Sequence, residues 1–238
     1  FWNDMNEPAI FYSEKHLKEV FEKMEDYKKM NLDVNTFFEM TGMIGGICNN
    51  PEDYASFYHN YKGRRYRHDQ VHNLFGYYMT RSASEAFERY VPEKRILLFS
   101  RASYIGMHRF GGIWQGDNAS WWSHLKMNVK MMPSLNMCGF LYTGADVGGF
   151  GADATEDLVL RWLEFAVFTP LLRNHSARGT RRQEVYRFSH VEKFADVIGV
   201  RYQILPYIYS EYMKAALQNT MMFNPLAFLY GEDTLAGQ

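Results

Sequence analysis

The sequence predicts an α/β fold built on a parallel sheet. Its 238 residues alternate between short apolar segments, typical of buried strands, and longer segments with the 3.6-residue period of amphipathic helices. The predicted strands share a polar carboxyl end, and the polar segments are, in chain order, WNDMNE, SRAS, WQGDN, TGADVGGF and RNHS. Polar ends on several strands favour a β/α barrel over a doubly wound sheet, which would concentrate its ligand groups at one switch point. Five strands are fewer than eight, so we expect part of a barrel, its carboxyl-terminal half.

The first predicted elements are a strand, a surface helix and a long connection. Residues 14–30 have helical periodicity, with Lys and Glu on the polar faces. The apolar face consists of Leu17, Val20, Phe21 and Met24. The segment from there to about residue 63 is rich in Asn, Gly and Thr and weakly periodic, so we expect a long excursion between elements, either a functional insertion or a spacer.

From residue 69 onward, helices and strands alternate. The predicted helices lie near 69–90, 120–132, 155–168 and 189–218. The predicted strands are RILLFS (95–100), IWQ ending at Gly116, MCGFLYT (137–143) and PLLRN (170–174). Pro206 is expected to bend the last helix.

The composition excludes several classes of protein. The 26 basic and 27 acidic side chains nearly cancel, so no strong field attracts nucleic acid or an anionic membrane. No apolar run reaches the roughly 18 residues of a membrane span. The aromatic content of 17% suits either an aromatic-rich core or a site that stacks flat ligands. Cys48 and Cys138 lie far apart without metal-type spacing, which indicates a reducing compartment and no disulfide framework.

Two carboxylates are the leading catalytic candidates. Asp4 in WNDMNE and Asp117 in WQGDN each follow an apolar or aromatic strand, where an unpaired carboxylate is costly unless it is solvated, hydrogen-bonded or used in chemistry. Glycoside hydrolysis needs such a pair, one group ionised and one protonated. The structural alternative for either residue is a helix cap or a turn.

Other side chains at the strand ends suit a sugar site. Arg101 directly follows RILLFS and can hold a carboxylate while it donates to a hydroxyl, although a salt bridge at the barrel rim explains it equally well. His175 in RNHS is either a donor to a substrate hydroxyl or a structural hydrogen-bonding residue. Trp114 and Phe150 are candidate stacking walls, with core packing as the alternative.

A metal site is the chemical alternative at these strand ends. The residues that can ligate a divalent ion are Asp4, Glu7, Asp117, Asp146 and His175. Arginine and aromatic residues crowd the same motifs, which is electrostatically awkward for a cation. A metal-dependent barrel lyase would lose activity with a chelator, whereas a two-carboxylate site would not. No Ser-His-Asp or Cys-His spacing is recognisable in the sequence.

Four motifs in order resemble one enzyme family. WNDMNEP, SRASYIGMHRFGGIWQGDNASWW, YTGADVGGFG and RNHS span most of residues 1–178 and resemble the family 31 glycoside hydrolases, whose typical members are retaining α-glucosidases. The resemblance implies a (β/α)8 TIM barrel, no cofactor and a small α-glucoside as substrate. The chain would supply about strands 4 to 8.

The resemblance also implies a role for each matched residue. Asp4 matches the nucleophile and Asp117 the general acid/base, which is expected to be buried beside Trp114. The residues that match contacts to the first sugar are Met5, Arg101, Trp114, Phe150 and His175. Asp146 matches a motif position that we place behind the substrate contacts. No metal is expected.

The resemblance further implies a division of the chain. Residues 1–218 would form the C-terminal part of the barrel, with an insertion at about 14–63, and residues 219–238 would begin a β-sandwich. The family's N-terminal β-sandwich and first barrel strands are absent, so we expect a fragment of a longer enzyme. Within the family, an α-xylosidase or a transglucosidase is the alternative function, and a non-catalytic carbohydrate-binding fragment is the alternative outside it. The sparse cysteines are the only indication of a cytoplasmic location.

Overall fold

Short parallel strands in chain order form the centre of the computed structural model, which describes residues 1–231. The strands of the main sheet are β1 (Trp2–Asn3), β4 (Phe99–Ser100), β5 (Gly112–Trp114) and β6 (Thr143–Gly144), paired in that order. After one residue, Ala145, the chain continues as β7 (Asp146–Val147), which pairs in parallel with β8 (Arg173–Asn174). Because the order never reverses, the sheet winds as a barrel does and has no switch point.

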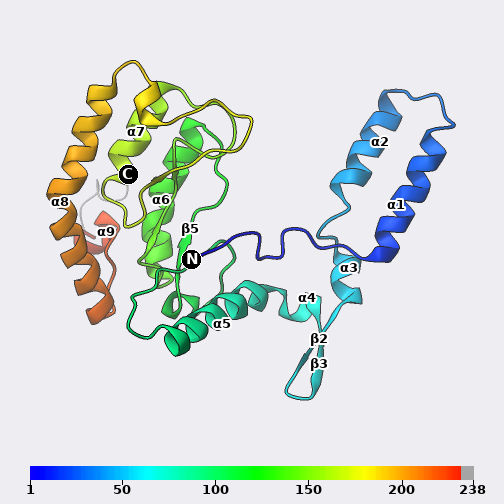
Figure 1. Ribbon diagram of the computed structural model, residues 1–238, viewed down its shortest axis with the longest axis horizontal. Helices are drawn as coiled ribbons and strands as arrows, with labels where there is room; N and C mark the ends of the chain where they lie inside the picture. The colour runs from blue at the N-terminus through cyan, green and yellow to red at the C-terminus, as the bar shows by residue number, and fades with distance from the viewer. Residues whose placement is uncertain (232–238) are drawn as a thin grey trace.

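Helices connect these strands and cover their outer side. α5 (Phe75–Tyr90) precedes β4, α6 (Trp122–Met137) connects β5 to β6, α7 (Glu156–Ala166) connects β7 to β8, and α8 (Val191–Gln218) follows β8. Figure 1 shows α6 beside β5, and α7 packs against both α6 and α8. Three short 3₁₀ helices also occur in the described residues: η1 (His72–Leu74), η2 (Met107–Arg109) and η3 (Val185–Arg187).

The apolar core has an inner and an outer part. Inside the sheet, Trp114, Phe99 and Leu171 pack together with Trp2 and Tyr142 at their edge. The larger outer cluster consists of Val147, Ala154, Leu158, Val159, Trp162, Leu163, Ala166 and Phe194, from β7, α7, α8 and the loop before α7. Side chains on a strand alternate between the two faces, which is why Ile113 packs outward with Met107 and Phe140 while Trp114 packs inward.

The segment expected to be a long excursion between elements, up to about residue 63, contains regular structure. It holds α2 (Val34–Gly45), α3 (Pro51–Ser56) and the hairpin of β2 (Tyr58–Tyr61) and β3 (Arg64–Arg67). Local signals explain each element. They are the Asp33–Thr36 capping box, the Asn50 cap followed by Pro51, and the positive φ angles of Lys62 and Gly63 in the hairpin turn.

The surface helix at the start of this segment is confirmed as α1 (Glu14–Tyr27). Val20 is buried, but Phe21 is exposed although it belongs to the predicted apolar face. Figure 1 shows the α1–α2 hairpin standing away from the barrel strands, with α3, α4 (His68–Val71) and the β2–β3 hairpin between.

Several predicted boundaries differ from the structure. The helix at 69–90 is divided into α4 (His68–Val71), η1 and α5, and the strand at 95–100 is reduced to Phe99–Ser100. The strand at 137–143 is largely wrong, since α6 continues through Pro133 to Met137 and β6 begins only at Thr143. Helices at 155–168 and 189–218 are confirmed as α7 and α8.

The predicted β-sandwich at 219–238 falls partly outside the described residues, because 232–238 are not described. Residues 219–231 contain the short helix α9 (Leu226–Leu229) and no strand. The division of the chain at residue 218 stays a prediction.

Two glycine substitutions test how closely the strands pack. A Cβ at Gly112 would lie 2.5 Å from the carbonyl oxygen of Tyr142 on the neighbouring strand, so Gly112→Ala is expected to lower the free energy of unfolding by about 1–3 kcal/mol. A Cβ at Gly199 in α8 meets nothing within 4 Å, so Gly199→Ala is expected to raise it by roughly 0.5–1 kcal/mol. Urea unfolding of both variants measures the difference. Equal effects in the two variants would contradict the packing at β5 and β6.

Candidate active site

The end of β1 presents Asp4 to solvent and turns Asn6 inward. The backbone of Met5 has a φ of 56°, in the left-handed region that costs a non-glycine residue about 1–2 kcal/mol. Its N–H donates to Asp4 Oδ1 over 2.7 Å. This strained turn keeps the side chain of Asp4 52% exposed and the side chain of Asn6 buried. Strain of this kind is concentrated at functional sites.

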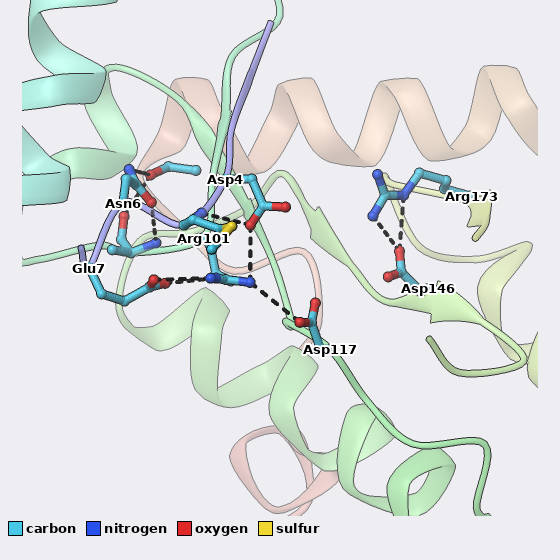
Figure 2. Close-up of polar contacts among 10 residues, drawn as sticks. Asp4, Asn6, Glu7, Arg101, Asp117, Asp146 and Arg173 are labelled. Carbon is cyan, nitrogen blue, oxygen red and sulfur yellow. Dashed lines mark hydrogen bonds and ion pairs between the residues drawn. The ribbon is translucent and has the colours of Figure 1, made fainter. Parts of the chain in front are cut away.

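Asn6 joins the end of β1 to the end of β4. Its Nδ2 donates to the hydroxyl of Ser100 over 2.8 Å, and its Oδ1 accepts from the backbone N–H of Ala102 over 3.0 Å. These two bonds bracket Arg101 and so fix the start of its side chain next to Asp4 (Figure 2). Asn6 was not among the predicted site residues, although it lies within the polar segment WNDMNE.

One guanidinium connects three carboxylates. Arg101 Nη1 lies 3.0 Å from Asp4 Oδ1 and 3.4 Å from Asp117 Oδ2. Its Nε and Nη2 donate to the two oxygens of Glu7 over 2.8 and 3.1 Å, a bidentate pair. Figure 2 shows the guanidinium between the three acids, with Glu7 on one side and Asp117 on the other. The fit of two parallel bonds makes Glu7 the partner that sets the orientation of Arg101.

Burial raises the pKa of Glu7, but the hydrogen bonds and charge of Arg101 outweigh it and hold that pKa below its ordinary value. The Glu7 side chain is 34% exposed and the Arg101 side chain 19% exposed. Glu7 was predicted only as a potential metal ligand. Its bidentate contact with Arg101 shows instead that the positive charge among these acids is a guanidinium.

The distance between the two catalytic candidates is bounded by their shared partner. Asp4 Oδ1 and Asp117 Oδ2 contact the same nitrogen, so these two oxygens lie no farther apart than the sum of 3.0 and 3.4 Å. Retaining glycosidases hold their two carboxyl groups about 5–5.5 Å apart, and inverting ones about 6.5–9.5 Å. The bound is compatible with a retaining arrangement.

Asp117 is not buried as expected. Its side chain is 48% exposed, and Trp114 is almost fully buried at 4%. The reason is the two-residue alternation of β5, which turns Trp114 onto Trp2 inside the sheet, with ring centroids 4.4 Å apart. This burial of Trp114 agrees with the core-packing alternative for this residue.

Asp146 and Arg173 form a second, buried ion pair (Figure 2). Arg173 Nε and Nη2 both donate to Asp146 Oδ1, over 2.9 and 2.6 Å, and the Arg173 guanidinium lies 4.0 Å from the ring centre of Trp2. Asp146 is 1% exposed and its Oδ2 has no hydrogen-bond partner. Burial raises the pKa of Asp146 and the charge of Arg173 opposes this. The pair therefore ties β7 and β8 to the strand that carries Asp4.

Phe150 and His175 lie together at the ends of the last strands. Their ring centroids are 5.3 Å apart, and His175 is exposed. Gln183, which the sequence analysis did not single out, fixes both loops: its Nε2 donates to the carbonyls of Val147, Gly149 and His175. Met5 is 46% exposed beside Asp4. The structure thus brings Asp4, Asp117 and Arg101 into direct contact and places Phe150 and His175 as a separate pair.

No three His, Cys, Asp or Glu side chains of residues 1–231 are grouped as metal ligands would be. No helix of the described part of the chain is long and apolar enough to cross a bilayer.

Paired carboxylates at the strand ends of a barrel-type sheet are the arrangement that many glycoside hydrolases use. The model of the TIM-barrel domain of glycosyl hydrolases family 31 matches residues 1–211, and the chain therefore belongs to this family.

Relatives and solved structures agree with this assignment. Alpha-glucosidase 2 of Bacillus thermoamyloliquefaciens is 31% identical over 98% of this chain and 25% of its own length. The crystal structure of a family 31 alpha-glucosidase from Bacteroides thetaiotaomicron has a TM-score of 0.67 and 33% identity, over 75% of this chain and 31% of that one. A family 31 dextranase from Flavobacterium johnsoniae, solved with isomaltotriose, has a TM-score of 0.70 and 26% identity, over 79% of this chain and 24% of that one. The chain spans about a quarter of the length of the curated relative.

Replacing Glu7 tests the orientation of Arg101. Glu7→Gln removes the charge and one of the two bidentate acceptors, so we expect the free energy of unfolding to fall by about 1 kcal/mol. The stabilisation from ionised Glu7 is present above its unfolded pKa and is lost as the pH falls through the lower folded pKa. Thermal unfolding of Glu7→Gln should therefore depend less on pH below about 4.5 than that of the natural protein. An unchanged acid dependence would contradict the pairing.

The buried Asp146 pair and the exposed Asp157 pair are expected to contribute different amounts to the free energy of unfolding. Asp146→Ala leaves Arg173 unpaired and is expected to cost about 3–5 kcal/mol of unfolding free energy. Asp157→Ala removes an exposed partner of Arg161 on α7 and is expected to cost less than about 0.5 kcal/mol. Chemical denaturation of the two variants compares them directly, and similar costs would refute the structural role of Asp146.

Proposed function

We propose that this protein hydrolyses terminal α-linked glucose from short α-glucosides with retention of configuration. The observation that carries the proposal is the approach of Asp4 and Asp117 to one nitrogen of Arg101, which limits the separation of the two contacting oxygens to a range compatible with a double displacement. Membership of a family whose relatives include proteins named as alpha-glucosidases supports the choice of substrate. The substrate is a small carbohydrate, and the proposal involves no cofactor.

In the first step, an Asp4 carboxylate oxygen forms a bond to the anomeric carbon. The bond from that carbon to the leaving-group oxygen breaks, and Asp117 gives its proton to that oxygen. In the second step, a water oxygen attacks the same carbon, the ester to Asp4 breaks, and Asp117 takes the water's proton. Atoms and charge balance over the two steps, and both aspartates return to their starting states.

Arg101 contacts both the aspartate that has to be ionised and the aspartate that has to be protonated. Its shorter contact, 3.0 Å, is to Asp4, which has to stay ionised to attack. Its longer contact, 3.4 Å, is to Asp117, which has to hold a proton in the first step. A guanidinium donates a weaker hydrogen bond to a protonated carboxyl group than to a carboxylate. When Asp117 holds its proton in the first step, Arg101 would therefore shift toward Asp4 and Glu7. Phe150 and His175 are proposed to contact the sugar and Met5 to line the site beside Asp4, whereas the burial of Trp114 favours its core-packing alternative.

We propose a cytoplasmic location on the cysteines alone. Cys48 and Cys138 are both free thiols in the structure, as expected in a reducing compartment.

Substitution of each aspartate tests the two roles. Asp4→Ala is expected to lower kcat at least about a thousandfold for every α-glucoside, since the covalent step is lost. Asp117→Ala is expected to lose about as much with maltose but much less with p-nitrophenyl α-glucoside, whose leaving group departs without a proton. Asp157→Ala, on the outer face of α7, is the control and should keep its rate. The proposal fails if Asp4→Ala keeps its activity, or if Asp117→Ala loses activity equally with both substrates.

A further inference from the structure

Three histidines form a hydrogen-bonded line where the insertion meets the barrel. His59 lies on β2, His68 begins α4 and His72 begins η1. Nε2 of His59 is 2.8 Å from Nδ1 of His68, and Nε2 of His68 is 3.2 Å from Nδ1 of His72. The middle ring uses a different nitrogen for each neighbour, so the rings do not converge on one point as metal ligands do. We call this set the histidine chain.

The middle ring is held firmly in place. His68 is fully buried and stacks on Phe11, with ring centroids 4.3 Å apart and planes 12° from parallel. Tyr54 of α3 packs edge-on against His68 and stacks on His72 at 4.7 Å. The backbone N–H of His68 donates to the carbonyl of Phe57 over 2.8 Å, just before the hairpin. The histidine chain thus joins the hairpin, α3 and the segment that follows Glu7.

Charged and titratable groups surround the histidine chain, and they come from each element packed against it. They are Asp69 with its partner Arg67, Asp53 with its partner His16, Tyr54, and Glu7. Of the acids, Glu7 belongs to the candidate site. Burial raises its pKa, Arg101 lowers it more strongly, and positive charge on His72 lowers it further. A proton on the histidine chain therefore favours the ionised Glu7 that orients Arg101.

The number of protons that the chain can hold follows from its geometry. Each neutral imidazole carries one N–H, so two N–H groups make the two N···N bonds and the third points outward at one end. A first extra proton occupies the outer nitrogen at the other end, and both bonds remain. A second extra proton has to enter a nitrogen that already faces an N–H, so one of the two contacts is lost.

We propose that the histidine chain is a pH-dependent positioning element for the Glu7–Arg101 pair. With no extra proton or with one, it holds the hairpin against the segment from Glu7 to Phe11. With a second proton, the hairpin separates and Arg101 loses its fixed orientation. This inference deepens the proposed function and rests on it, since the role of Arg101 in turnover is itself proposed.

Burial, together with the charges of His59 and His72, lowers the pKa of His68. A lowered pKa of His68 means that acid destabilises the closed arrangement, as the proposal requires. The stabilisation from neutral His68 is present above its unfolded pKa of roughly 6.5 and is lost as the pH falls below that value.

Hydrogen exchange of the full-length natural protein tests, without any substrate, whether the histidine chain opens when it takes up protons. Peptides covering residues 57–72 are followed between pH 7.5 and 5 by mass spectrometry, with rates corrected for the intrinsic effect of pH. Opening takes up one proton, so protection is expected to fall about tenfold per pH unit on the acid side. His59→Phe removes the hydrogen bond between the hairpin and His68 in every protonation state, and His68→Phe removes both N···N bonds while it keeps a flat ring on Phe11, so both should make the protection independent of pH.

The control is His190→Gln. His190 pairs with Glu156 beside α7 and α8, away from the histidine chain, and this variant should keep the natural pH dependence. Should His68→Phe fail to fold, His59→Phe decides alone, because His59 is only half-buried on the hairpin. Protection that is flat in the natural protein, or that falls as steeply in His59→Phe as in the natural protein, overturns the proposal.

A pH profile of turnover separates this inference from the proposed function. The acid loss of kcat/KM for p-nitrophenyl α-glucoside should coincide with the loss of protection, and should be missing in His59→Phe but present in His190→Gln. If the natural protein cleaves no α-glucoside at any pH, the proposed function fails, while the exchange result still decides whether the histidine chain opens with protons. If it cleaves and the His59→Phe profile keeps the acid loss, the histidine chain does not position Arg101.

Discussion

The candidate site depends on one cation. Asp4 and Glu7 follow β1 and Asp117 follows β5, the two strands on either side of β4. Three like charges at such distances would repel one another strongly in a partly desolvated site. Arg101 contacts all three and is itself mostly buried. Its position depends in turn on Asn6, which fixes the backbone on either side of it. Loss of the guanidinium would therefore disturb both the charge balance and the geometry of the site.

A second set of contacts holds the strands that frame this cation. Asp146 and Arg173 are paired in the interior, and the Arg173 guanidinium lies against Trp2, the residue two positions before Asp4. Gln183 joins the two loops that carry Phe150 and His175. The open, solvated cluster around Arg101 thus rests on buried polar contacts, each of which costs free energy to form but restricts the strand ends to one arrangement.

The insertion is connected to the same site through the segment after β1. Glu7 binds Arg101, and Phe11, four residues later, stacks on His68 in the centre of the histidine chain. The α1–α2 hairpin lies beyond this junction (Figure 1). Movements of the insertion would therefore reach Arg101 through Glu7, and the aromatic and imidazole rings at the junction are the contacts that resist them.

The sequence by itself determined the parallel α/β sheet, the polar strand ends and the acids Asp4 and Asp117, because a buried strand followed by polar residues is a local pattern. Local signals also existed for α2, α3 and the hairpin, in the caps at Asp33 and Asn50 and in the Lys62–Gly63 turn, but weak hydrophobic periodicity concealed them. Only the tertiary structure decided that Glu7 pairs with Arg101, that Trp114 faces Trp2, that Asp117 is half exposed, and that His59, His68 and His72 form a line. Each of these depends on which residues of separate elements meet, and no spacing along the chain specifies that.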